Sequence, residues 1–401
     1  MTNAQKSSAV IVDAVRTPLG KRNGSLKDWH PVDLAAHTLE AVTTRNDLDP
    51  AVIDDVIMGC VSQAGEQTGN IGRNAVLAAG FPETVPGTSV DRQCGSSQQA
   101  LHFAAQAVMS GTMDCVIAAG VESMSRIPMT VGKIYKDAGL GHYMSPTIWE
   151  RYPGPEFSQF MGAEMMAEKY QLSRDALDCY SLQSHQRAAA ATRDGSFADE
   201  IAPVAVRVAG APAPDVIDDE MHVADEGIRS DATLEGIRGV KLLREGGRIT
   251  AASASQICDG ASGVIVVNDR GLKAIGASPL ARIHQMTVIG GDPVIMLEAP
   301  LPATHHALKK AGLTVDDIDL FEVNEAFASV PVAWLQDTGA DPARLNVNGG
   351  AIALGHPLGA SGTRLMTTLV HALQARGKRY GLQTMCEGGG QANVTIVEGS
   401  G

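Results

Sequence analysis

The chain has 401 residues, of which 44% are hydrophobic and 19% are charged, and its formal net charge is −13. These values are ordinary for a globular protein and allow two or three packed units, each with its own apolar core. The acidic balance excludes a global basic surface for nucleic acid, and no apolar run approaches the roughly 20 residues of a membrane-spanning helix. We therefore expect neither a nucleic-acid partner nor a membrane partner.

Six cysteines are scattered along the chain. None forms a C-x-x-C pair, which argues against a disulfide framework and a zinc site, so we expect separate reduced thiols and no bound metal. The N-terminal stretch lacks the apolar core of a signal peptide and the Arg-rich pattern of a transit peptide, and the C-terminus is not a peroxisomal tripeptide. A cytoplasmic location is the resulting expectation.

Short apolar runs typical of strands alternate with amphipathic stretches typical of helices, which predicts an α/β fold. The predicted strands, in chain order, are 10–12, 56–58, 116–119, 264–267 and 319–323. The predicted helices, in chain order, are 34–42, 100–109, 176–191 and 365–373.

The two ends of the chain resemble each other weakly. AVIDDVIMG, which begins at residue 51, is similar to TVDDIDLFEV, which begins at residue 314. CGSSQQAL is similar to LGASGTRL, and both are a glycine-containing turn followed by a predicted helix; DCVIAAGVES is similar to GLQTMCEGGG. We infer two copies of one α/β unit.

Residues 121–248 differ in character from both copies. The region is rich in Met and Pro at first, then helical in pattern, then rich in Pro and Asp. This predicts a long insertion that covers a site and does not extend a sheet. A disordered linker is the alternative, but Trp149, Tyr152, Phe157 and Phe160 are unusual in a disordered segment.

Cys94 is the first candidate for chemistry. It follows a strand-like approach and precedes a predicted helix in SVDRQCGSSQQALHFAA. A thiol at a helix N-terminus lies at the positive end of the dipole near free N–H groups, which lowers its pKa and favours the thiolate. A buried structural cysteine is the alternative, and the position at the turn favours a nucleophile over it.

His356, in NGGAIALGHPLGASG, lies just before the turn of the second copy that corresponds to the Cys94 turn of the first. Two equivalent turns that face each other across a pseudo-twofold axis would bring a thiol and an imidazole together as an activated nucleophile. A histidine stacked in a Gly/Pro loop for structural reasons is the alternative.

Two further residues follow predicted strands of the second copy. Cys386, in TMCEGGGQAN, precedes three glycines whose N–H groups could form an anion-binding nest, and a thiol there can act as an acid or base if its pKa is near neutrality. Asn324, in NEAFA, lies at the carboxyl end of the predicted strand 319–323 and could fix a water or a carbonyl. The alternatives are a glycine hairpin with an incidental cysteine and a helix cap.

Five stretches in fixed order, VIVDAVRTPLGK, the Cys94 turn, NEAFA, GHPLGASG and CEGGG, together resemble the thiolase family over nearly the whole chain. The resemblance implies two similar mixed-sheet α/β halves, layered α-β-α-β-α, with a loop domain inserted in the first half. The implied bounds are 1–120 and 249–275 for the N-terminal half, 121–248 for the loop domain over the coenzyme A site, and 276–401 for the C-terminal half. A homodimer or homotetramer is also implied.

The resemblance further implies reversible CoA-dependent cleavage of 3-ketoacyl-CoA to acetyl-CoA and a shortened acyl-CoA, or the reverse Claisen condensation, through a thioester on Cys94. His356 would activate Cys94, and Cys386 would exchange a proton with the α-carbon of the acetyl unit. Asn324 would hold a water that joins His356 in one oxyanion hole, and the N–H groups of Cys94 and Gly388 would form another. Losing one such donor typically costs about 10²–10³ in rate.

Acyl-CoA and CoA are the expected partners, with CoA as a substrate and no permanently bound cofactor. By the resemblance, Arg229 lies near the nucleotide end of CoA and Ser255 bonds the pantetheine arm. Met161, Ala326 and Phe327 match positions that line the acyl and pantetheine tunnel.

The chain departs from the family pattern in three places. Thiolases specialised for acetoacetyl-CoA commonly carry a His where this chain has Phe160, in QFMG. The usual Ser-Gly of the CoA-binding stretch reads Ser255-Gln256, and Gln391-Ala392 stands where Gly is frequent. The first departure favours a degradative thiolase for longer or bulkier acyl chains over a biosynthetic, acetoacetyl-CoA-specific one.

Two other classes of function compete with a catalytic thiolase. A ketosynthase-like condensing enzyme pairs its cysteine with His/His or His/Asn in other motifs, so Cys386 and NEAFA count against it. A non-catalytic acyl-CoA-binding protein would have no need of the four polar candidates Cys94, Asn324, His356 and Cys386 together.

Overall fold

The computed structural model describes residues 8–207 and 217–400. Its largest element is a ten-stranded mixed sheet with the order β10-β11-β12-β9-β1-β8-β5-β3-β4, in which β2 also pairs with β8. The strands are β1 (Val10–Arg16), β2 (Gly20–Lys21), β3 (Asp55–Gly59), β4 (Gly87–Val90), β5 (Cys115–Ser123), β8 (Cys258–Val267), β9 (Ala281–Gly290), β10 (Leu320–Val323), β11 (Tyr380–Glu387) and β12 (Gln391–Gly399). A second sheet contains β6 (Val204–Arg207) and β7 (Ile217–His222).

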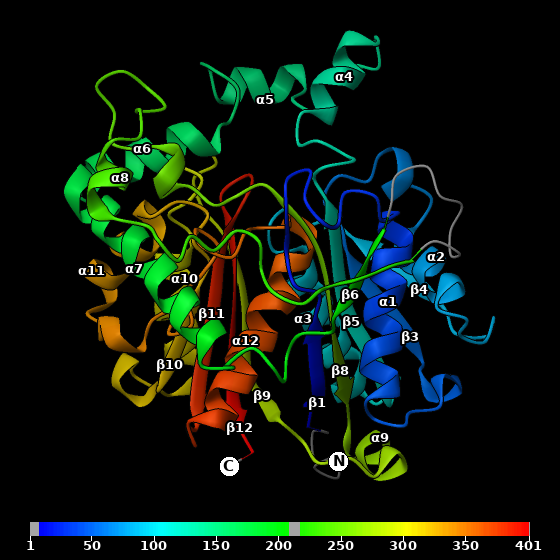
Figure 1. Cartoon of the computed structure of the whole chain (residues 1–401). Helices are drawn as coiled ribbons and strands as arrows, with labels where there is room; N and C mark the ends of the chain where they lie inside the picture. Colours follow the sequence, from blue (N-terminus) through cyan, green and yellow to red (C-terminus); the bar gives the residue numbers. More distant parts are fainter. Residues whose placement is uncertain (1–7, 208–216, 401) are drawn as a thin grey trace.

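Helices cover both faces of the large sheet (Figure 1). They are α1 (Pro31–Thr44), α2 (Ile71–Ala78), α3 (Ser96–Ser110), α4 (Val131–Asp137), α5 (Pro146–Arg151), α6 (Gln159–Lys169), α7 (Arg174–Arg193), α8 (Leu234–Arg238), α9 (Asp269–Ile275), α10 (Pro300–Ala311), α11 (Ser329–Thr338) and α12 (Ser361–Ala375). Each predicted helix falls within one of these elements, and so does each predicted strand except 319–323, which begins one residue before β10. No helix in the two described ranges is long and apolar enough to cross a membrane.

Three apolar clusters pack helices and strands together into five layers. One joins α1 and α2 to the first half of the sheet, and another joins α10 and α11 to the second half. Between the halves, α3 and α12 form a central layer whose apolar side chains pack on strands of both halves. This is the predicted α-β-α-β-α layering, so the fold class is confirmed.

The two halves of the sheet repeat one topology. In the first half β1, β8, β5 and β3 are neighbours, paired antiparallel, antiparallel and parallel; in the second half β9, β12, β11 and β10 follow the same order with the same pairings. The halves meet where β1 pairs antiparallel with β9 at Val10↔Arg282 and Ile11↔Ala281. The inferred internal repeat is therefore confirmed by strand order.

The inner strands are buried on both faces because helices cover both sides of the sheet. In β5 all nine residues are buried. Ile117 and Ala119 pack with α1 and α2, whereas Val116 and Ala118 pack with α3 and α12, as the two-residue period of a strand requires. The apolar run at 116–119 that predicted a strand is nearly continuous because helices cover both faces of β5.

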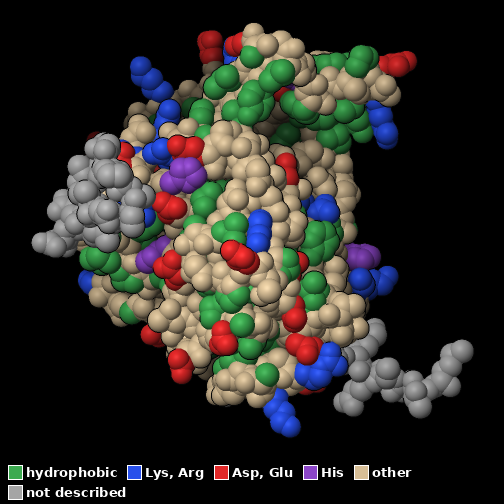
Figure 2. Space-filling view, turned by 90° about the vertical axis from the view of Figure 1, so that its right-hand side faces the viewer, with side chains coloured by type: hydrophobic (Ala, Val, Ile, Leu, Met, Phe, Trp, Pro, Cys, Tyr) green, Lys and Arg blue, Asp and Glu red, His purple; other side chains and the backbone are tan. Residues whose placement is uncertain are grey.

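The chain between β5 and β8 carries α4 to α8 and the β6–β7 hairpin, so the described part of this insertion is folded and the linker alternative is wrong. Helices α4 and α5 project at the top of the molecule (Figure 1), and Figure 2 shows hydrophobic side chains gathered on this projection. Helix α7 packs on the second half, where Tyr180 and Ser184 donate hydrogen bonds to Glu325 at 2.9 and 2.7 Å. Residues 208–216 of the insertion lie outside the described residues.

Helices α3 and α12 touch backbone to backbone. A Cβ atom at Gly362 would overlap the backbone nitrogen of Gln98, and one at Gly120 would overlap the carbonyl oxygen of Gly359. The N–H of Thr363 donates to Ser97 Oγ at 3.0 Å, which ties the first turns of the two helices together. Only glycine permits this separation.

We expect Gly362→Ala to lower the free energy of unfolding by about 3 kcal/mol, because the added methyl group meets backbone that has no room to move. Urea denaturation followed by circular dichroism measures the change. Gly132→Ala on α4 is the matched control, since a Cβ there meets nothing within 4 Å, and it leaves stability unchanged or raised by about 0.5–1 kcal/mol. Equal stabilities of wild type and Gly362→Ala would refute the packing argument.

Candidate active site

Cys94 lies in the turn between β4 and α3. The preceding residue, Gln93, has a φ of 49°, in the left-handed region that non-glycine residues seldom adopt. Two hydrogen bonds hold this turn: the N–H of Arg92 donates to Ser96 Oγ at 3.0 Å, and Ser96 Oγ donates to the carbonyl of Gln93 at 2.6 Å. The strained turn presents Cys94 at the start of α3, where its side chain is 9% exposed.

The environment of the Cys94 thiol combines donors and burial. Burial, followed by the carboxyl of Glu387, raises the pKa of Cys94 to about 12, although the N–H groups of Cys94 and Gly388 both lower it. The expectation that the helix N-terminus gives a low pKa is therefore wrong for the unliganded protein, because desolvation outweighs the donors. The thiol is protonated at rest, and the two predicted N–H groups do lie around its sulfur.

Cys386 is the second thiol of this cluster and lies at the end of β11, 1% exposed. Burial raises its pKa well above the ordinary value, and the neighbouring Cys94 raises it further. The two sulfurs are thus close enough for charge on one to act on the other. The sequence analysis required a near-neutral pKa for Cys386 to act as an acid or base, and the buried thiol does not meet that condition. It is protonated at rest.

His356 precedes the first turn of α12. Its Nδ1 lies 2.5 Å from Ser361 Oγ, and Ser361 donates to the carbonyl of Pro357 at 2.9 Å, so Nδ1 carries the proton and Nε2 is an acceptor. Burial, with a smaller contribution from the cation of Arg364, lowers the pKa of His356 to about 3. The imidazole is therefore neutral and can accept a proton on Nε2.

Asn324 follows β10 and is fully buried. Its Nδ2 lies 3.3 Å from His356 Nε2, and its Oδ1 has no hydrogen-bond partner among the described residues. A buried amide oxygen without a partner is a position for an ordered water or a ligand donor. The structure thus brings Asn324 and His356 together, as the family resemblance implied.

A cavity of about 170 Å³ opens onto His356. Its walls include Ser255 and Phe327, and Phe160 packs edge-on against Phe327 with 5.4 Å between ring centroids. Leu358 also lines this cavity and belongs to the apolar cluster that contains Cys94, which places the nucleophile next to the cavity wall.

A second cavity, of about 270 Å³, is lined by Arg229 and His185. It shares Ala251 and Gln256 with the His356 cavity, so the two adjoin. The backbone N–H of Arg229 donates to His185 Nδ1 at 3.2 Å, and burial lowers the pKa of His185 to about 4, which leaves Arg229 beside a neutral ring.

Two of the predicted tunnel residues do not line these cavities. The carbonyl of Ala326 lies behind the wall and accepts the N–H of Ser255 at 2.9 Å. The sulfur of Met161 lies 3.8 Å from the guanidinium of Arg244, while its neighbour Phe160 forms the wall. Phe160 thus lines the cavity from α6, and the role of Met161 in lining a tunnel stays a prediction.

Gln256 explains one departure from the family pattern. Its side-chain amide donates to the carbonyls of Gly227, Ile352 and Ala353 at 2.8, 2.8 and 3.0 Å. A residue without this side chain would leave the turn that precedes His356 unbraced against the loop that precedes Arg229.

Three polar residues of the site were not found from the sequence: Ser361, Glu122 and Glu325. Glu122 accepts the N–H of Gly359 at 2.8 Å and so holds the turn after His356. Glu325 accepts the N–H of Ile352 at 3.0 Å. The available signal was a carboxylate within an apolar run, since a buried carboxylate requires donors.

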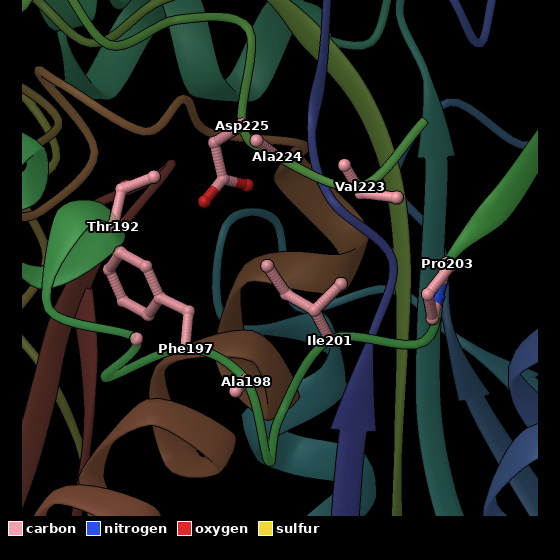
Figure 3. Close-up of a pocket in the computed structure, with 9 residues that line it drawn as sticks. Thr192, Phe197, Ala198, Ile201, Pro203, Val223, Ala224 and Asp225 are labelled. Atoms are coloured by element: carbon pink, nitrogen blue, oxygen red, sulfur yellow. The ribbon is translucent and has the colours of Figure 1, made fainter. Parts of the chain in front are cut away.

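A third cavity, of about 260 Å³, lies beside Phe197 and Ile201 and is lined by none of the predicted site residues. Figure 3 shows the carboxylate of Asp225 pointing into it. Both oxygens of that carboxylate are already bonded to the guanidinium of Arg16, at 2.7 and 3.0 Å. This cavity therefore offers no free reactive group. In the described parts of the chain no cluster of three or more metal-binding side chains occurs.

Comparisons with known proteins agree with this geometry. The family description "Thiolase, N-terminal domain" matches residues 9–270, and "Thiolase, C-terminal domain" matches residues 277–399. The steroid 3-ketoacyl-CoA thiolase FadA6 of Mycobacterium tuberculosis is 52% identical, covering 98% of this chain and 95% of the relative. The 3-oxoadipyl-CoA/3-oxo-5,6-dehydrosuberyl-CoA thiolase of Escherichia coli is 42% identical, covering 97% and 99%.

Solved structures share the fold. The acetyl-CoA acetyltransferase of Bacillus anthracis has a TM-score of 0.88 at 35% identity, covering 98% of this chain and 99% of its own. Human mitochondrial 3-ketoacyl-CoA thiolase has a TM-score of 0.87 at 36% identity, covering 99% and 100%. The chain belongs to the thiolase family and is an acyltransferase with thiolase function.

Ser361→Ala removes the partner that holds Nδ1 of His356 and frees the ring to rotate. We expect kcat for thiolysis to fall about tenfold with little change in KM, since a hydrogen bond that orients a catalytic ring is worth about 1.4 kcal/mol. Steady-state kinetics measures the split, and Ser110→Ala at the exposed end of α3 is the control. An unchanged kcat would show that Ser361 does not hold the ring.

Proposed function

We propose that this chain cleaves 3-ketoacyl-CoA with free CoA through an acyl thioester on Cys94. The observation that carries the proposal is the meeting of two thiols and an imidazole from both halves of the fold: Cys94 and Cys386 lie close enough for charge on one to act on the other, and His356 lines the cavity beside the apolar cluster that contains Cys94. A ring nitrogen that can accept a proton and a thiol that can supply one are the groups that acyl transfer to a cysteine requires.

In the first half-reaction, Nε2 of His356 takes the thiol proton as the sulfur of Cys94 attacks the ketone carbon. The tetrahedral oxyanion collapses, the bond between the α-carbon and the ketone carbon breaks, and the acyl group stays on Cys94. The Cys386 thiol gives its proton to the α-carbon of the departing acetyl-CoA. Its protonated resting state, which burial maintains, supports this direction of transfer.

In the second half-reaction, the thiol of free CoA attacks the thioester on Cys94. The Cys386 thiolate accepts the thiol proton of CoA, acyl-CoA leaves, and the proton on His356 returns to Cys94, which restores both thiols.

We assign one oxyanion hole to the N–H groups of Cys94 and Gly388, and the other to His356 with a water held by Asn324. Support comes from the two N–H groups around the sulfur and from Asn324 Oδ1, which no described residue bonds.

CoA is proposed to bind as a substrate along the two adjoining cavities, with no permanently held cofactor. Arg229 would meet the nucleotide end, and Ser255 would contact the pantetheine arm where the cavities join. The cation of Arg229 supplies the local positive charge that a net charge of −13 otherwise denies to a phosphate ligand.

We propose that the acyl group is larger than acetoacetyl. Phe160 and Phe327 give the His356 cavity an aromatic wall, and Phe160 is 46% exposed, so an acyl chain that passes it buries apolar surface. The 52% identical relative is named for steroid 3-ketoacyl-CoA, and the 42% identical one for 3-oxoadipyl-CoA. An acyl chain derived from a ring compound fits this position better than a two-carbon unit.

We also propose a homodimer or homotetramer in the cytoplasm. β4 ends the large sheet, and among the described residues it pairs with β3 alone, so its outer edge is available to a second copy. All six cysteines are free thiols, which suits a reducing compartment. A single-chain mass by sedimentation equilibrium would contradict the oligomer.

Incubation with 3-ketoacyl-CoA in the absence of free CoA is expected to add one acyl mass to Cys94 of the wild type. Cys94→Ala is expected to carry no adduct and to lose at least about 10³-fold in turnover, since the nucleophile of a covalent mechanism has no substitute. Peptide mass spectrometry locates the adduct. Cys179→Ala on α7, whose thiol is exposed, is the control and stays active. An adduct on another residue would refute the mechanism.

Thiolysis of 3-ketoacyl-CoAs of graded length tests the substrate size. We expect kcat/KM to rise beyond the four-carbon substrate, and Phe160→His to reduce the preference for long chains about tenfold by removing apolar contact. Phe103→His on α3, exposed and away from the cavity, is expected to leave the preference unchanged. A strict preference of the wild type for acetoacetyl-CoA would overturn this part of the proposal.

A further inference from the structure

Glu387 is a buried carboxyl that the mechanism above does not use. It ends β11 between Cys386 and Gly388 and has no exposed surface. A Cβ atom at Gly95 would overlap its Oε1, so the carboxyl lies directly against the backbone that follows Cys94. Neither carboxyl oxygen has a hydrogen-bond partner among the described residues.

The groups that face this carboxyl do not neutralise it. From the β4–α3 turn, Arg92 acts on it at a distance, and no ion pair between them occurs within the described ranges. Cys94 from the same turn and Cys386 from its own strand are both protonated thiols. From β12, the backbone N–H of Asn393 contributes a weaker favourable interaction.

The helix that begins at this turn adds no compensating charge. His102 of α3 lies beside Asn393, with 3.3 Å between His102 Nδ1 and Asn393 Nδ2, and burial lowers its pKa to about 3, so it is neutral. The guanidinium of Arg92 donates through Nη1 to Gln391 at 2.7 Å, which directs that nitrogen at β12. A negative charge on Glu387 would therefore be compensated only in part, by Arg92 and the N–H of Asn393, beside the nucleophile.

Burial raises the pKa of Glu387 to about 8, partly offset by the cation of Arg92. Below that pH the carboxyl of Glu387 is neutral, and of the two carboxyl groups that raise the pKa of Cys94 the weaker contribution, that of Glu122, remains. Above it the carboxylate forms, and its charge is the second cause, after burial, of the high pKa of Cys94. The sign is that of any like-charge pair: ionisation of one member disfavours ionisation of the other.

We propose that Glu387 is a positioning residue that controls the charge state of Cys94: protonated, it leaves the thiolate to the N–H groups of Cys94 and Gly388, and ionised, it suppresses that thiolate. This inference rests on the proposed role of Cys94 as the nucleophile. The rate of acyl transfer is then limited at alkaline pH by ionisation of Glu387, which lies next to Cys94. A carboxyl that only filled space there would produce no such limit.

The test is the rate at which iodoacetamide alkylates Cys94 from about pH 6 to about pH 10, followed by peptide mass spectrometry in wild type and Glu387→Gln. The rates are expected to coincide near neutrality and to diverge above about pH 8, until the variant reacts about tenfold faster near pH 10, the scale of a one-unit change in thiol pKa. Glu387→Leu, which also removes the charge, is expected to give the same divergence.

Glu322→Gln is the matched control. Glu322 lies on β10, its pKa is also raised to about 8 by burial, and it interacts with Arg364 and not with Cys94. Its profile is expected to follow the wild type. Parallel profiles for wild type and Glu387→Gln over the whole range would overturn the proposal, as would the same divergence in Glu322→Gln.

Infrared difference spectra provide a measurement that does not depend on turnover or on a variant's activity. In the wild type, a protonated carboxyl band that is absent from Glu387→Leu is expected at neutral pH, with loss of the band near pH 8. Absence of that band at neutral pH would also overturn the proposal. Because alkylation and infrared spectra report on Cys94 and Glu387 directly, failure here is distinguishable from failure to find an acyl adduct on Cys94.

Discussion

Backbone contact between α3 and α12 is the constraint on which the site depends. Cys94 comes just before α3 and His356 just before α12, so the separation of the two helices decides how far the thiol lies from the imidazole. Glycines at 120, 359 and 362 allow that separation, and the bond from Thr363 to Ser97 fixes the register. Each half of the repeated fold contributes one turn, and neither half contains the site alone.

Burial is the second determinant, and it acts on every titratable group of the site in the same direction. It opposes charge, so both thiols stay protonated, His356 stays neutral and Glu387 gains a proton near neutrality. These four groups are therefore uncharged at rest. Charge that develops during acyl transfer then meets fixed N–H donors with little water to screen them, which is the condition under which such donors are most effective.

From the sequence, the repeat predicted two copies of one α/β unit and the meeting of the Cys94 and His356 turns, and the family resemblance implied the five layers. Helix and strand periods are local, and a turn at a helix N-terminus is visible in a short stretch of sequence, so these features were predictable. The bounds of the inserted domain stay a prediction. The roles of the site residues stay proposals.

The properties that the sequence analysis got wrong or missed are those that depend on tertiary burial. The dipole of α3 predicted a low pKa for Cys94, but the cost of desolvation comes from residues distant in sequence, and it is larger. Ser361 and Glu387 carry no signal of their own: one is a serine in a small-residue turn, and the other separates a cysteine from a glycine. Their importance appears only when the partner group, His356 or Cys94, is placed beside them.

The central claim is that the thioester on Cys94 is polarised by backbone donors from both halves of the fold. A crystal structure of the enzyme trapped with an acyl group tests it most directly. The account predicts an acyl group on Cys94 Sγ whose carbonyl oxygen lies about 3 Å from the nitrogens of both Cys94 and Gly388. An acyl oxygen that points away from these two nitrogens, or an acyl group on a different residue, would contradict it.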